Sequence, residues 1–172
     1  MLKWLRRGPS PHQTALAMIG ARAGDRVLFA GSPQPALAAE IARITGLNGR
    51  TLVVSATPET DAALQAAAEE AGALVDLARA FPSGDVANDV VVLAISTGEV
   101  SRAALVEAYG ALRSGGRLIV IAGTRRAGLF AGKTDTPPPN ADATVQSLID
   151  AGGRAARLLA TAEGVSYYEA RK

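Results

Sequence analysis

The chain has 172 residues, of which 48% are apolar, enough for one domain of ordinary size with a buried core. Its 18 lysines and arginines and 16 acidic residues leave a net charge of +2, too small to indicate a nucleic-acid partner by itself. With no cysteine and one histidine, His12, the sequence excludes disulfides and thiolate or His-rich metal sites, and it argues against a Ser-His-Asp triad. No apolar run reaches the roughly 18 residues of a membrane-spanning helix, so we expect a cytoplasmic protein without a transmembrane segment.

Residues 1–9 form an N-terminal tail that places three basic residues among Leu2, Trp4 and Leu5. A frayed tail, or one tucked against the domain, is one interpretation. A contact with a membrane surface or a partner protein is the other. We expect residues 10–172 to form a single domain.

The first predicted helix follows a capping box formed by Ser10, Pro11 and Gln13. It should run from Pro11 to Ile19 and end at Gly20. His12 lies in the first turn of this helix. Two interpretations stay open for its side chain: it lies at the surface, or it lines a ligand site.

The stretch around which the rest is organised begins with the apolar run from Arg26 to Ala30, which predicts a buried parallel strand. Gly31 follows at the strand's end, where a positive φ or the close approach of a ligand favours glycine. The next helix has one apolar face, made of Leu37, Ile41 and Ile44. Strand, glycine and helix in this order are typical of a nucleotide site in open α/β sheets. The loop from Gly31 to Pro35, however, is not the G-x-G-x-x-G phosphate-binding motif.

Strands and helices alternate along the rest of the chain. Further strands are predicted at 51–55, 74–78, 89–95, 117–122, 155–162 and 165–170, the last two joined by a turn at Glu163 and Gly164. Further helices are predicted at 58–71, over Leu105 to Leu112 with an end at Ser114-Gly-Gly116, and after Asn140 with Val145, Leu148 and Ile149 on one face. This alternation implies a parallel sheet with helices on both faces.

The long loop over residues 123–139 carries Arg125, Arg126 and Lys133. Loops of this length are often functional. We expect it to form a lid or wall over the carboxyl ends of the strands, with its cations facing an anionic substrate. A solvated basic loop is the alternative.

In this order of elements, the sequence resembles class I S-adenosylmethionine (SAM)-dependent methyltransferases from about Ser10 onward. Residues 24–31 are similar to the first motif of that family, residues 48–59 to its second strand, and residues 108–118 to its double-glycine turn and fifth strand. The resemblance implies an α/β, Rossmann-like sheet of seven strands in the order 3-2-1-4-5-7-6, with strand 7 antiparallel. The cofactor domain of medium-chain dehydrogenases shares part of the pattern, but the final hairpin favours the methyltransferase.

The departures from the family pattern fall on the cofactor site. Phe29 stands where the family usually has an acidic residue, and Pro33 and Pro35 replace two glycines. Ser55 stands where an acidic residue would bind ribose hydroxyls, and Asp76 lies inside the third strand, away from the position expected for adenine recognition. The cofactor-binding positions that the resemblance implies are therefore a degenerate set: Phe29, Gly31, Ser32, Ser55, Ala56 and Ile95.

Two functions stay open. One is a methyltransferase with an unusual cofactor loop and an unidentified substrate, because transfer from a sulfonium needs mainly proximity and alignment. The other is a non-catalytic methyltransferase-like binding module. Each missing polar contact costs on the order of tenfold in affinity, so we expect weak SAM binding or none. We also expect the Phe29 ring to fill part of the crevice. No catalytic residue is indicated, and a homo-oligomer stays open.

Overall fold

The computed structural model describes residues 11–32, 34–82, 87–96, 99–123 and 140–172. Within these residues, seven strands form one sheet in the order β3-β2-β1-β4-β5-β7-β6. The strands are β1 Arg26–Gly31, β2 Arg50–Val54, β3 Asp76–Ala78, β4 Asn88–Ile95, β5 Leu112–Ala122, β6 Arg154–Ala162 and β7 Val165–Arg171. Strands β1 to β5 are parallel, whereas β7 is antiparallel to both β5 and β6. The predicted strand order and the antiparallel seventh strand are confirmed.

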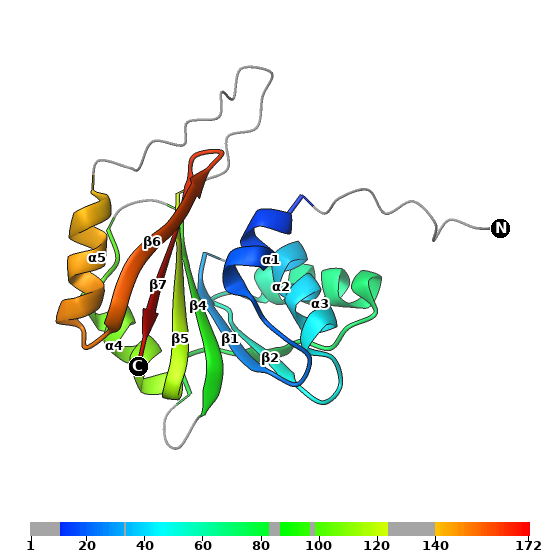
Figure 1. Cartoon of the computed structure of the whole chain (residues 1–172). Helices are drawn as coiled ribbons and strands as arrows, with labels where there is room; N and C mark the ends of the chain where they lie inside the picture. Colours follow the sequence, from blue (N-terminus) through cyan, green and yellow to red (C-terminus); the bar gives the residue numbers. More distant parts are fainter. Residues whose placement is uncertain (1–10, 33, 83–86, 97–98, 124–139) are drawn as a thin grey trace.

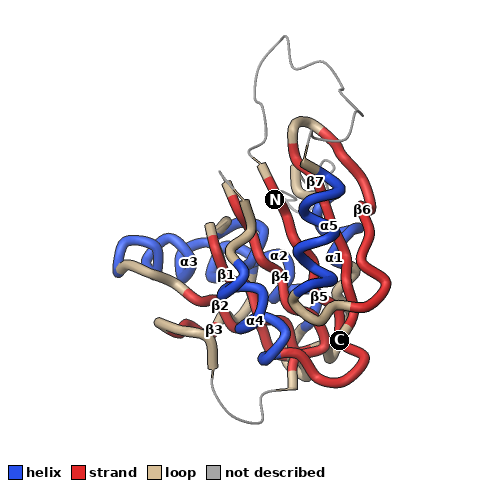
Figure 2. The backbone as a smooth tube through the Cα atoms, turned by 90° about the vertical axis from the view of Figure 1, so that its left-hand side faces the viewer, coloured by secondary structure: helices blue, strands red, loops and turns tan. Residues whose placement is uncertain are grey.

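Helices cover both faces of the sheet, as predicted (Figure 1). They are α1 Gln13–Ile19, α2 Pro35–Thr45, α3 Pro58–Ala71, α4 Arg102–Ala111 and α5 Ala141–Asp150. The first three lie on one face, and α4 and α5 lie on the other. Figure 2 views the molecule from the side of α4 and α5, and the strands follow one another across the picture from β3 at the left to β6 at the right.

Strand β1 shows why the central strands read as continuous apolar runs. Val27 and Phe29 pack into the core under α1, α2 and α3, whereas Leu28 and Ala30 pack into the core under α4 and α5. Successive side chains of a strand point to opposite faces, so a strand that is covered on both faces needs apolar residues at every position.

None of the described helices has the length and apolarity that crossing a bilayer requires.

The boundary between α4 and β5 differs from the prediction. The helix ends at Ala111, and Ser114, Gly115 and Gly116 belong to β5, instead of ending the helix. The reason is a contact that is distant in sequence: Asn88 Nδ2 donates a hydrogen bond of 2.8 Å to the Ala111 carbonyl. This amide satisfies a carbonyl at the end of the helix and draws the following residue, the first of β5, into the sheet.

Smaller differences concern single residues. Helix α1 begins at Gln13, two residues later than predicted, and Asp76 is the first residue of β3 and does not lie inside it. Ile149 is 46% exposed, whereas Leu148 and Val145 of the same helix reach the core. The predicted capping box is wrong: His12 is the N-cap of α1, it makes no side-chain capping bond, and Pro11 lies before the helix. The tail over residues 1–9, Ser10 and residues 124–139 of the basic loop lie outside the described residues.

Candidate functional site

The strand order reverses between β1 and β4, which is where ligands bind in open α/β sheets. Gly31 ends β1 there with φ +93°, and a Cβ atom at this position would lie 2.0 Å from the Ala94 carbonyl oxygen. The next residue, Ser32, donates its amide hydrogen bond to that same oxygen over 2.7 Å. Only glycine allows the end of β1 to approach β4 this closely.

Two serine hydroxyls join the ends of these strands. Ser32 Oγ donates a hydrogen bond of 2.9 Å to Ser96 Oγ, and the Ser96 amide donates to Ser32 Oγ over 3.3 Å. Ser96 directly follows β4. The pair therefore bridges the point at which the sheet order reverses.

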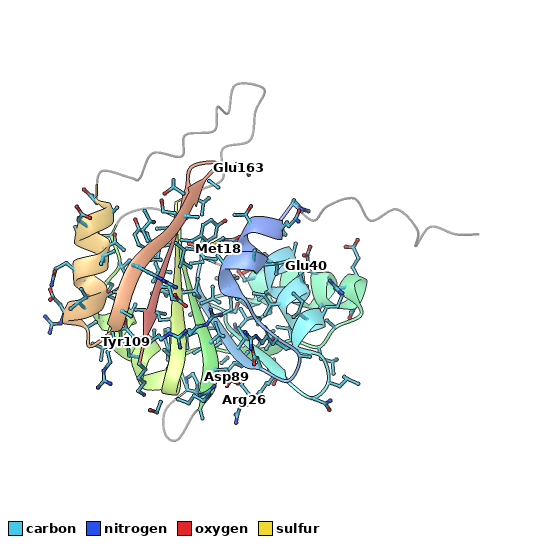
Figure 3. The ribbon with its side chains drawn as sticks, in the orientation of Figure 1. Met18, Arg26, Glu40, Asp89, Tyr109 and Glu163 are labelled. Carbon is cyan, nitrogen blue, oxygen red and sulfur yellow. The ribbon has the colours of Figure 1, made fainter. Side chains whose placement is uncertain are left out.

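Two cavities adjoin this bridge and share Ser32, Ile95 and Ser96 in their walls. The first, of about 290 Å³, lies toward α1, and its polar lining includes His12, Thr14, Gln34, Glu163 and Tyr167. The second, of about 470 Å³, lies toward α4, and its lining includes Gly31, Glu99 and Ser101. Figure 3 shows Glu163 in the turn after β6, at the end of the molecule opposite to Asp89 and Arg26.

The end of β2 is closed by contacts within the protein. Ser55 is 1% exposed, and its hydroxyl donates a hydrogen bond of 3.3 Å to the Thr57 carbonyl. Arg79, just after β3, donates from Nη1 to the Ser55 carbonyl over 3.3 Å and to Asp61 Oδ1 over 3.0 Å. Its Nη2 donates to the other Asp61 oxygen, which makes the ion pair bidentate. The Arg79 guanidinium lowers the pKa of the Asp61 carboxyl, and Asp61 raises the pKa of Arg79.

Three of the six predicted site positions line the cavities: Gly31, Ser32 and Ile95. Ser55 and Ala56 lie at the end of β2, outside the walls of both. The expected place of the Phe29 ring is wrong: the ring is fully buried in the core with Val27 and does not fill the crevice. Alternation along β1 explains this, because Phe29 points under α1 and α2. Whether any of these residues contacts a ligand stays a prediction.

Sequence reasoning missed most of the polar residues of the first cavity. For His12 the sequence leaves a place in a ligand site open, and the structure puts this residue in the wall. Ser96 follows β4, Glu163 lies in the turn between β6 and β7, and Tyr167 lies in β7. No local pattern places them at the site, because the pairing of β1 with β4 and of β5 with β7 brings these segments together. Among the described residues, no three His, Asp or Glu side chains come together as a metal-binding group.

Comparison with solved structures identifies the fold. A SAM-dependent methyltransferase from Aquifex aeolicus superposes with a TM-score of 0.67 at 16% identity, over 94% of this chain and 93% of that one. A precorrin-6y C5,15-methyltransferase from Geobacter metallireducens gives 0.67 at 15% identity, over 99% and 92%. The [4+2]-cyclase SpnF gives 0.66 at 19% identity, over 92% and 79%. No protein-family model and no curated protein sequence matches this chain. At these identities the likeness shows the fold alone, that of class I SAM-dependent methyltransferases.

Proposed function

We propose that this chain, which has the fold of class I SAM-dependent methyltransferases, binds a small ligand at the carboxyl ends of β1, β4 and β5 and binds SAM weakly or not at all. One observation carries the proposal. Ser55 stands where the resemblance implies a ribose-binding carboxylate, and its hydroxyl is already bonded to the Thr57 carbonyl. A methyltransferase-like binding module is the function that this geometry supports best.

The donors and acceptors that SAM would need are few at this edge. Pro35 begins α2 without an N–H, and the Ser32 amide is used by the Ala94 carbonyl. A buried ribose hydroxyl without a partner costs about 1–3 kcal/mol. Two such losses move a micromolar dissociation constant toward about 1 mM.

Asp61 could supply the missing carboxylate for a ribose hydroxyl only if its ion pair with Arg79 were broken. Both of its oxygens accept hydrogen bonds from Arg79, and its side chain is 18% exposed. A ligand that uses Asp61 must first displace a bidentate, charge-assisted pair. This requirement also favours weak SAM binding.

Calorimetric titration with SAM and with S-adenosylhomocysteine tests the proposal. We expect dissociation constants of about 0.1 mM or weaker, or no measurable heat. A low micromolar constant would overturn the proposal and restore the enzyme interpretation.

Ser55→Asp should strengthen SAM binding by about tenfold if the ribose position is otherwise intact, because it returns the acceptor. Ser55→Asn, which has a similar shape without the charge, is the matched control. A substitution of Phe29 is unsuitable, because that ring belongs to the core.

Methyl transfer is the second candidate, and the two adjoining cavities favour it. A transferase must hold donor and acceptor in contact, and here two cavities adjoin each other and share Ser32, Ile95 and Ser96 in their walls. His12 and Glu163 line the first cavity, where a base could accept a proton from the methyl acceptor. Formation of S-adenosylhomocysteine from millimolar SAM and a panel of small phenols and amines would support this candidate, if His12→Ala removes it. The cytoplasmic compartment, a homo-oligomer and the absence of a nucleic-acid partner stay predictions.

A further inference from the structure

Arginines gather at the end of the sheet opposite to the candidate site, near the end where Figure 3 shows Asp89 and Arg26. Arg117 of β5 lies directly across from Arg171 of β7, and Arg171 lies directly across from Arg154 of β6. Like charges that face each other on neighbouring strands destabilise a sheet. The fold therefore keeps a row of three arginines in spite of their mutual repulsion.

Only one member of this row has an acidic partner among the described residues. Arg117 Nη1 lies 3.3 Å from Glu169 Oε1, and its Nη2 donates to the Ile19 carbonyl at the end of α1. Glu169 is buried, and it is shared with Arg157, whose Nη2 lies 2.7 Å away. The side chains of Arg154 and Arg171 are exposed, and neither has a carboxylate partner among the described residues.

An open cavity of about 250 Å³ lies beside the row. Its wall includes four arginines and two aspartates: Arg22, Arg113, Arg117, Arg171, Asp25 and Asp89. Asp89 is occupied by Arg113 at 2.5 Å, and Asp25 accepts a hydrogen bond from the Arg22 amide at 2.8 Å. Within the described chain, the guanidinium groups of Arg22 and Arg171 are thus left without an acid, and both line the cavity.

We propose that this arginine pocket, defined by Arg22, Arg117 and Arg171, binds phosphate groups. A guanidinium donates two parallel hydrogen bonds to a phosphate, a geometry that a lysine does not offer. An anion seated between the arginines replaces their repulsion with attraction. The phosphate can belong to a free polyphosphate compound or to a nucleic-acid backbone. The pocket lies at the other end of the strands from the candidate site, so this inference does not depend on the proposed function.

Calorimetric titration of the whole chain with inorganic tripolyphosphate at low salt tests the pocket. We expect saturable binding, weakened at least tenfold in the double variant Arg22→Gln/Arg171→Gln, because two charge-assisted contacts are lost. The matched control is Arg102→Gln, an exposed arginine at the start of α4, which should bind as the unmodified chain does. A second titration uses a labelled twelve-nucleotide single-stranded RNA. RNA binding that is tighter than tripolyphosphate binding and falls steeply with salt assigns the phosphate to a nucleic acid. Tighter tripolyphosphate binding assigns it to a free compound.

Thermal unfolding provides a readout that a purely structural role would not give. Without ligand, Arg171→Gln should leave the unfolding midpoint unchanged or raise it, because it removes a repulsive neighbour of Arg117 and Arg154. Tripolyphosphate should raise the midpoint of the unmodified chain and of Arg102→Gln, but not that of the double variant. If neither tripolyphosphate nor RNA binds, or if Arg102→Gln loses as much affinity as the double variant, the proposal is wrong.

Discussion

At the scale of single residues, Gly31 sets the geometry of the candidate site. Its φ of +93° and the 2.0 Å that would separate an added Cβ atom from the Ala94 oxygen leave no room for a side chain. The oxygen belongs to a buried central strand, which cannot move aside without disturbing both cores. The close approach of β1 and β4 therefore depends on this one position.

Gly31→Ala should lower the free energy of unfolding by about 2–4 kcal/mol, because it combines an unfavourable φ with a backbone collision. Urea denaturation measures the change. The matched control is Gly110→Ala in α4, where a Cβ meets nothing within 4 Å. Alanine is the better helix former, so this control should raise stability by up to about 1 kcal/mol. Equal effects of the two substitutions would contradict the role assigned to Gly31.

At the scale of elements, Glu169 joins the last two strands to β5. Its carboxylate is 5% exposed and lies 3.3 Å from Arg117 of β5 and 2.7 Å from Arg157 of β6. One buried anion on β7 thus pairs with cations on both neighbouring strands. Without it, Arg117 would keep its contact with the end of α1 but would lose its counter-charge.

Glu169→Gln should cost about 2–4 kcal/mol of the free energy of unfolding, because it leaves a partly buried arginine unpaired. Chemical denaturation checks this value. Glu107→Gln, on the exposed face of α4, makes the same chemical change where no ion pair exists in the described structure, and it should alter stability by less than about 0.5 kcal/mol. A Glu169→Gln protein as stable as the unmodified chain would show that the ion pairs of Glu169 with Arg117 and Arg157 contribute little to the free energy of unfolding.

At the scale of the whole molecule, Asp89 couples three strands at the end opposite to the candidate site. Its carboxylate accepts the Arg26 amide of β1 at 2.8 Å and pairs with Arg113 of β5 at 2.5 Å, while Asp89 itself belongs to β4. Partial burial pushes the pKa of Asp89 upward, but the Arg26 amide and the Arg113 guanidinium outweigh it and hold the pKa below its usual range.

This lowered pKa predicts acid sensitivity. The folded state binds the Asp89 proton more weakly than the unfolded state, so the stabilisation is present above the unfolded pKa of about 4 and is lost as pH falls through the folded pKa. Asp89→Asn should therefore reduce stability at pH 7 and flatten the fall in stability below about pH 4. Unfolding free energies measured across the range from neutral to strongly acidic pH check both. The matched control is Glu70→Gln, which makes the same change from acid to amide at an exposed position of α3.

Local patterns were sufficient to predict the strands and most of the helices. Apolar runs, turn glycines and helix starts depend on residues close together in the chain. The resemblance to class I SAM-dependent methyltransferases implied the strand order, and the structure has that order. The two-residue turn at Glu163 and Gly164 was also predicted from the sequence. The structure confirms it, because both residues adopt the positive φ that such a hairpin turn requires. The same patterns indicated that Gly31 ends the strand beside the ligand edge.

Other features required contacts between distant segments. The end of α4 depends on Asn88, 23 residues before the carbonyl that it binds, and the direction of Phe29 depends on which helices cover β1. The Asp61–Arg79 pair closes the end of β2 across 18 residues.

Charge is the clearest case of what the tertiary structure alone decided. The composition shows a nearly balanced chain with a net charge of +2. Strand pairing nevertheless brings Arg117, Arg154 and Arg171 into one row, and the cavity beside it also includes Arg22. Net charge sums over the whole chain, whereas the electrostatic potential at a surface depends on distance, and only folding determines which charges are close together.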